Sequence, residues 1–154
     1  MSMAVTIALA IWLVCISTLD YRYLRLPNFL TLPLIAGGLV WSSIAQGVEG
    51  LQASAGASLF AYASISFLRS LPGALRNGIG MGDAKLLAGV GAWLGLSYLA
   101  PVLLVSATLG LTYAGALRLV GREIRRTSLI PFGPFLCIAF FVFWCVANAG
   151  SLVG

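Results

Sequence analysis

The chain has 154 residues, of which 60% are hydrophobic and 8% are charged, and its mean hydropathy is +1.03. Water-soluble domains carry about 25% charged residues, so this composition excludes a soluble enzyme and predicts a polytopic membrane protein with a single domain, residues 1–154. We attribute the net charge of +5 to membrane topology and to contact with anionic lipid, and we expect no nucleic-acid binding.

Six apolar runs follow one another along the chain, each close to the length of a helix that crosses a bilayer. They are Met3–Leu19, Pro27–Ala45, Leu51–Leu68, Leu86–Ala100, Val102–Leu119 and Ile130–Val146. We therefore predict an all-α fold with about six transmembrane helices. No basic segment precedes the first run and no small-residue cleavage site follows it, so we expect this run to remain as a span.

The lysines and arginines lie in alternate loops between these runs. They are Arg22, Arg25, Arg69, Arg76, Lys85, Arg118, Arg122, Arg125 and Arg126. The opposite loops hold Glu49 and no cation. Because cytoplasmic loops are enriched in Lys and Arg, we expect the cationic loops in the cytoplasm and both termini outside. Asp20 and Asp83 would then both face the cytoplasm.

The types of reactive side chain in the sequence narrow the chemistry further. There is no histidine, which argues against Ser-His or Cys-His catalysis and against most transition-metal sites. Cys15, Cys137 and Cys145 lie inside apolar runs and form no Cys-x-x-Cys pair, which argues against a zinc or redox site. We expect no metal and no cofactor, and carboxylates remain as the natural acid–base groups.

Two of the four acidic residues stand at the ends of apolar runs. Asp20 closes the first run, and Asp83 precedes the fourth run within Gly80-Met81-Gly82-Asp83. A carboxylate at a span end is tolerated better than one in mid-span, so its simplest role is at the water interface beside a cation. The two glycines favour a functional role for Asp83, because a backbone without side chains lets an extended peptide approach.

A pair of carboxylates at the same membrane depth fits peptide hydrolysis without a metal. This reaction needs a base to activate water and an acid to protonate the departing amine. Two neighbouring carboxylates do not both ionise easily, so they share a proton and supply both functions. We therefore predict that Asp20 and Asp83 meet across the helical bundle as a catalytic pair.

Three motifs in this order resemble the type IV prepilin peptidases, and the resemblance covers nearly the whole chain. They are Asp20 with Leu26-Pro27-Asn28, then Gly80-x-Gly82-Asp83-x-Lys85, then Pro131-Phe132-Gly133-Pro134. The resemblance implies that Asp20 and Asp83 are catalytic. It implies that the other motif residues bind substrate or line its site, namely Gly80, Gly82, Lys85, Pro27, Asn28, Pro131 and Gly133, with a structural role as the alternative for the Pro131–Pro134 turn. Lys85 would orient Asp83 or hold a substrate carbonyl.

The resemblance implies a membrane aspartyl endopeptidase that removes the short basic leader of a prepilin or pseudopilin. It would work at the cytoplasmic face of the bacterial inner membrane, surrounded by membrane lipid. Longer members of the family carry an insertion with two Cys-x-x-Cys pairs and also N-methylate the new pilin terminus. This sequence shows no such insertion and resembles the short form associated with Flp or tight-adherence pili, without methyltransferase activity.

Two other functions fit parts of the sequence. A proton-coupled transporter would use the aspartates as ion relays, but it favours carboxylates near the bilayer midplane. A non-catalytic scaffold of a pilus assembly machine accounts for small residues that suit close helix packing, but not for the paired acids. Those small residues are Ala53, Ala57, Ala61, Gly91 and Gly95. The sequence leaves open which pilin is cut and the oligomeric state.

Overall fold

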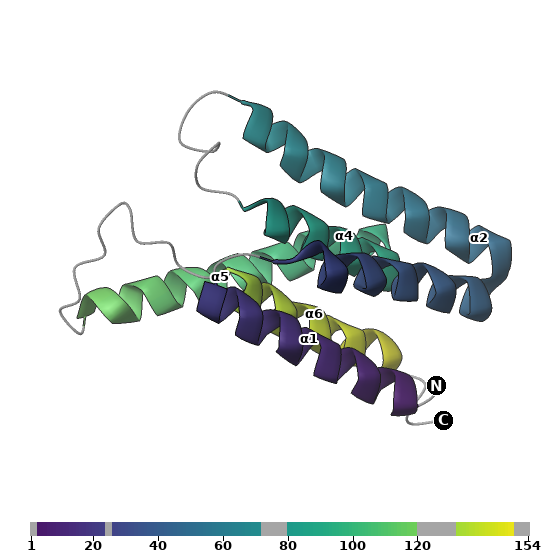
Figure 1. The fold of residues 1–154 in the computed structure, drawn as a ribbon, viewed down its shortest axis with the longest axis horizontal. Helices are drawn as coiled ribbons and strands as arrows, with labels where there is room; N and C mark the ends of the chain where they lie inside the picture. The colour runs from purple at the N-terminus through teal and green to yellow at the C-terminus, as the bar shows by residue number, and fades with distance from the viewer. Residues whose placement is uncertain (1–2, 24–25, 72–79, 120–131, 150–154) are drawn as a thin grey trace.

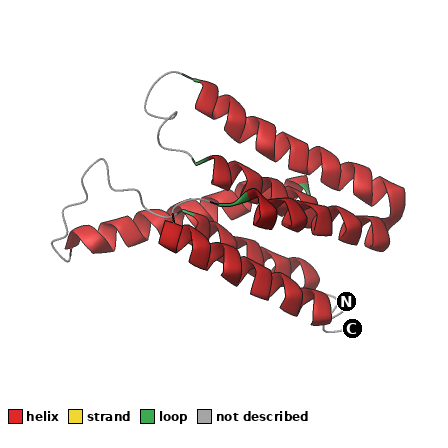
Figure 2. Cartoon of the chain, in the orientation of Figure 1, coloured by secondary structure: helices red, strands yellow, loops and turns green. Residues whose placement is uncertain are grey.

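The structure is a computed structural model that describes residues 3–23, 26–71, 80–119 and 132–149. These residues form five α-helices and one short 3-10 helix, and the described ranges contain no strand (Figure 2). The elements are α1 (Met3–Tyr23), α2 (Asn28–Ser70), α4 (Met81–Leu94), η1 (Leu96–Tyr98), α5 (Leu99–Leu119) and α6 (Gly133–Ala149). The all-α prediction is therefore confirmed.

Helix α2 consists of two antiparallel arms, residues 28–46 and 48–70, that meet at Gly47 (Figure 1). Gly47 has φ 69° and ψ −152°, a backbone conformation that favours glycine. Beyond the turn, the Ser54 hydroxyl donates a hydrogen bond of 2.8 Å to Ser42 Oγ on the first arm. The second and third predicted runs therefore fall on separate arms of one helical hairpin.

Among the described residues, three helices are long and apolar enough to cross a membrane, namely Met3–Tyr23, Asn28–Ser70 and Leu96–Leu119, and Gly133–Ala149 is a shorter apolar helix. The fourth predicted run differs from the structure, because Gly95 ends α4 with φ 81° and its last residues belong to η1 and α5. Helix α4 has 14 residues, or about 21 Å of helix, which is shorter than a bilayer core. The count of six spans stays a prediction.

The helices run alternately up and down, so their ends collect at two poles (Figure 1). The first turn of α1 and the last turn of α6 lie at one pole. The last turn of α1, both ends of α2 and the first turns of α4 and α6 lie at the opposite pole, which we call the loop pole. Helix α4 packs on α2 and α6, and α6 packs on α1 and α5. This arrangement places Asp20 and Asp83 at the same pole.

Small residues let α4 approach the second arm of α2 closely. A Cβ atom on Gly91 would lie 2.8 Å from the carbonyl carbon and oxygen of Ala57. Ala57 and Ala61 are buried, which confirms their predicted role in packing. Ala53 is exposed, and Gly95 ends α4 at a positive φ, so neither has the packing role predicted for it.

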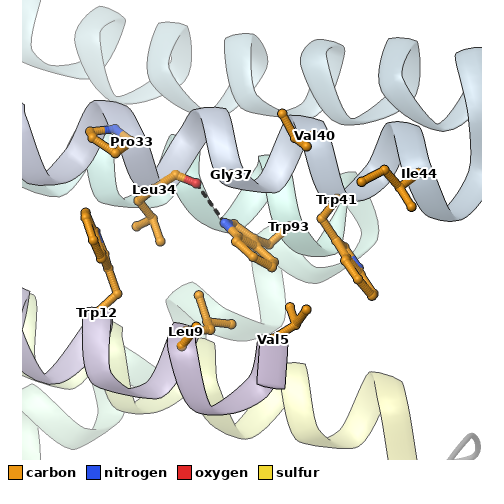
Figure 3. Close-up of a pocket in the computed structure, with 11 residues that line it drawn as sticks. Val5, Leu9, Trp12, Pro33, Leu34, Gly37, Val40, Trp41, Ile44 and Trp93 are labelled. Atoms are coloured by element: carbon orange, nitrogen blue, oxygen red, sulfur yellow. Dashed lines mark hydrogen bonds between the residues drawn. The ribbon is translucent and has the colours of Figure 1, made fainter. Parts of the chain in front are cut away.

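Tryptophans fill the pole opposite the loop pole. Trp144 of α6 contacts Trp93 and Trp41 edge-on, with ring centroids 5.2 and 6.2 Å away. An apolar hollow of about 400 Å³ lies beside this cluster, between α1 and the first arm of α2 (Figure 3). The indole N–H of Trp93 donates to the Leu34 carbonyl on its wall, at 2.8 Å. Neither Asp20 nor Asp83 lines this hollow.

Candidate active site

Asp20 continues the buried face of α1. The buried residues of this helix recur at spacings of three or four, as Leu9, Leu13, Ile16 and Asp20. These spacings place all four side chains on one stripe of the helix, directed towards the bundle. Asp20 is 7% exposed, so a carboxyl group occupies a position where the pattern of α1 would otherwise place an apolar side chain.

The Asp20 carboxyl group is held by the first residue of α6. The Gly133 N–H donates a buried hydrogen bond of 3.0 Å to Asp20 Oδ2. Gly133 begins α6, and the first N–H groups of a helix have no partner within the helix and favour a nearby negative charge. A Cβ atom on Gly133 would lie 2.5 Å from Asp20 Oδ2, so the contact requires glycine.

Asp83 is held in the same way at the start of α4. Gly80 is the N-cap of this helix, Asp83 lies in its first turn, and the Gly80 N–H donates a hydrogen bond to the Asp83 carboxylate. An acidic side chain that reaches back to the N-cap is the arrangement of a capping box. A Cβ atom on Gly80 would lie 3.0 Å from Asp83 Oδ2, so this glycine also leaves little room for a side chain.

The two aspartates are close enough for their charges to interact. Helix α6 connects the helices that carry them, because it packs on both α1 and α4. The buried side chain of Cys137, one turn beyond Gly133, lies near both carboxylates. Two neighbouring carboxylates repel when both are ionised. The structure thus brings Asp20 and Asp83 to the same region of the bundle, and their role as a catalytic pair stays a prediction.

The Leu26-Pro27-Asn28 segment is seated on the first turns of α4. A Cβ atom on Gly82 would lie 2.9 Å from Cβ of Leu26, so the bare backbone of Gly82 receives this leucine. The Lys85 ammonium group donates a hydrogen bond to Asn28 Oδ1. Pro27 is the N-cap of α2. In the structure Gly82, Lys85 and Asn28 make contacts within the protein, and their predicted substrate contacts stay a prediction.

The hydrogen bond between Lys85 and Asn28 gives a testable coupling. We expect Lys85→Met and Asn28→Ala each to lower the free energy of unfolding, with a coupling energy of about 0.5–1 kcal/mol in the double variant, because both lose the same bond. Thermal unfolding of the detergent-solubilised protein measures it. Lys85→Met combined with Gln52→Ala, on the second arm of α2, is the control and should be additive. If the effects of Lys85→Met and Asn28→Ala on the free energy of unfolding are additive, the hydrogen bond between Lys85 and Asn28 is contradicted.

Sequence reasoning missed how each aspartate is held. It placed Gly133 in a turn that is structural or lines the substrate and did not pair it with Asp20, although Pro134 before an apolar run is a signal for a helix start, where the first N–H groups are free. Pro131, the other residue predicted in that turn, lies outside the described residues. Within the described ranges, no three His, Cys, Asp or Glu side chains gather as a metal site.

Comparison with known proteins agrees with this geometry. Residues 7–115 match the type IV leader peptidase family, a segment that contains both aspartates. The chain belongs to this family. Among its relatives is a prepilin leader peptidase/N-methyltransferase of Xanthomonas campestris pv. campestris, 39% identical over 144 residues, which are 90% of this chain and 49% of that protein.

Other members of the family are similar at the same level. Prepilin leader peptidase/N-methyltransferases of Aeromonas hydrophila and Legionella pneumophila are 38% and 36% identical, over 82% and 88% of this chain and 44% and 48% of their own length. The chain thus spans about half the length of the curated relatives it matches. No solved structure matches it.

Proposed function

We propose that this protein is a membrane aspartyl endopeptidase that cleaves the leader peptide of prepilins or pseudopilins. The observation that carries the proposal is the location of two carboxylates, Asp20 near the end of α1 and Asp83 in the first turn of α4, at one pole of an apolar helical bundle. Membership of the type IV leader peptidase family supports the same reaction. The test is to incubate membranes containing the protein with a prepilin and look for the shortened product.

The proposed mechanism uses the two carboxyl groups with one proton between them. The ionised aspartate accepts a proton from a water molecule, whose oxygen attacks the carbon of the scissile carbonyl. The protonated aspartate donates to the carbonyl oxygen, giving a tetrahedral intermediate. The amide nitrogen is then protonated, the carbon–nitrogen bond breaks, and the leader leaves with a new carboxyl terminus. Burial of Asp20 keeps bulk water from competing for these protons.

We place the active site at the cytoplasmic face of the bacterial inner membrane. Among the described cations, Arg22, Arg69 and Lys85 lie near helix ends at the loop pole, and Arg118 lies in the last turn of α5. Glu49 lies beside the turn of α2 at the opposite pole. Since Lys and Arg are enriched on the cytoplasmic side, the loop pole and its aspartates would face the cytoplasm.

Site-directed labelling tests this orientation. In a variant whose native cysteines are replaced by alanine, single cysteines at Glu49 and Arg122 are expected to react from opposite sides of the membrane. A membrane-impermeant thiol reagent applied to spheroplasts should label the Glu49 position alone. A cysteine at Arg22 is the control and should behave like the one at Arg122. Labelling of the Glu49 and Arg122 positions from the same side would contradict the topology.

We further propose that the substrates are Flp-type pilins and that these 154 residues do not carry N-methylation. The cysteines support the second point, because none forms a Cys-x-x-Cys pair and all three lie within α1 and α6. The relatives named for both activities are about twice as long as the segment they share with this chain.

Mass spectrometry of the product distinguishes the two activities. We expect the purified protein, given a prepilin and a methyl donor, to release a shortened pilin with an unmethylated amino terminus. A relative named as a prepilin leader peptidase/N-methyltransferase, assayed in parallel, is the positive control for methylation. A methylated terminus produced by this chain alone would contradict the proposal.

A further inference from the structure

Asp20 is held by α6, a helix that contains neither of the two proposed catalytic aspartates. Gly133 N donates to Asp20 Oδ2 at 3.0 Å, across 113 positions of the chain. The donor belongs to the first turn of α6, where the Phe132 carbonyl accepts the N–H groups of Phe135 and Leu136. The Gly133 N–H precedes these bonds and is directed out of the helix, towards the carboxyl group.

Helix α6 is a rigid support for this donor. Leu136 and Phe140 are fully buried, and Trp144 is 1% exposed and contacts two other tryptophans. These side chains anchor the helix on α1 and α4, so the position of the Gly133 N–H is fixed by the core. A donor on a packed helix holds a functional group more accurately than one on a free loop.

The missing side chain of Gly133 matters for Asp20 as much as its hydrogen bond does. A Cβ atom there would lie 2.5 Å from Oδ2, 2.8 Å from Cγ and 3.1 Å from Cβ of Asp20. These distances are below van der Waals contact, so any side chain would push the whole Asp20 carboxyl group out of place. Other glycines are different, because a Cβ atom on Gly56 or Gly115 would meet nothing within 4 Å.

We propose that Gly133 is a positioning residue that fixes the catalytic carboxyl group of Asp20 through its main-chain N–H and its missing side chain. This inference rests on the proposed function and deepens it. One carboxyl oxygen is tied to α6, which leaves the other oxygen for the shared proton and the water. Gly133 therefore acts on the chemical step through Asp20, and not as part of the wall that binds the substrate.

Kinetics of the full-length protein in lipid nanodiscs test the proposal. Gly133→Ala is expected to lower kcat for prepilin cleavage about 100-fold while KM stays within a factor of two, since a displacement of about 1 Å in a catalytic group has effects of this size. Gly56→Ala and Gly115→Ala are the matched controls and should keep the wild-type kcat. A rise in KM with unchanged kcat would overturn the proposal in favour of a substrate-lining role.

A backbone substitution separates the hydrogen bond from the steric effect and does not depend on the folding of Gly133→Ala. Glycolic acid in place of Gly133 turns the amide into an ester, which removes the N–H and adds no atom. We expect kcat to fall about 10-fold or more, with KM unchanged, while the same ester at Gly115 has no effect on kcat. A Gly133 ester with the wild-type kcat would overturn the proposal.

The two proposals fail in different ways. If the unmodified protein cleaves no prepilin, or if Asp20→Asn remains active, the proposed function fails and the role of Gly133 fails with it. If the unmodified protein cleaves, Asp20→Asn is inactive and the Gly133 ester is fully active, the proposed function stands and the positioning role alone is refuted.

Discussion

Asp20→Asn and Asp83→Asn are each expected to abolish prepilin cleavage in a protein that still folds. Asparagine has nearly the same shape as aspartate but neither accepts nor gives up the proton that the mechanism moves. General acid–base catalysis by one group contributes about 10²- to 10⁴-fold, and here one proton serves both groups, so each variant should lose at least about 10³-fold in rate. Purified protein and a prepilin substrate, with the product measured over time, provide the assay.

The geometry around Asp20 makes this a fair test of chemistry. The amide oxygen of an asparagine can still accept the Gly133 N–H, so the hydrogen bond at 3.0 Å need not be lost. Glu49→Gln is the matched control, because it removes one exposed carboxylate next to the turn of α2 and should leave cleavage unchanged. A scaffold protein would tolerate all three changes. Full activity of either aspartate variant would refute the proposal that Asp20 and Asp83 are a catalytic pair.

Hydropathy and charge predicted the parts of the site that depend on membrane depth. Asp20 follows an apolar run and Asp83 precedes another, and two residues at such ends share a pole whenever the helices alternate in direction. The same reasoning found the motif glycines. It could not find their partners, because Gly133 and Asp20 lie 113 positions apart and hydropathy does not specify which helices are neighbours.

Local backbone geometry accounts for the remaining differences. The fourth predicted run continued through Gly95, since glycine is common in apolar spans, but φ of 81° ends the helix there. The sequence predicts that substrate packs against Gly82, and in the structure the Leu26 side chain contacts the backbone there. A missing side chain creates room, and sequence alone does not tell whether a ligand or the protein itself occupies it.

Gly91→Ala is expected to have the largest effect on stability among the glycine-to-alanine changes in α4. The added Cβ would lie 2.8 Å from backbone atoms of Ala57, which cannot move unless α4 and the second arm of α2 separate. Such overpacking costs about 1–3 kcal/mol, against a gain of about 1 kcal/mol in helix propensity. We therefore expect a net loss of up to about 2 kcal/mol in the free energy of unfolding.

Two other glycines provide a graded comparison. At Gly89 the added Cβ would meet the Leu34 side chain at 2.9 Å, and that side chain can turn away, so the loss should be smaller. At Gly56 it would meet nothing within 4 Å, so alanine should be neutral or stabilising. Thermal unfolding in one detergent ranks the three variants. Because α4 carries Asp83, Gly91→Ala should also lower the cleavage rate, and equal stability of Gly91→Ala and Gly56→Ala would contradict the close approach of the two helices.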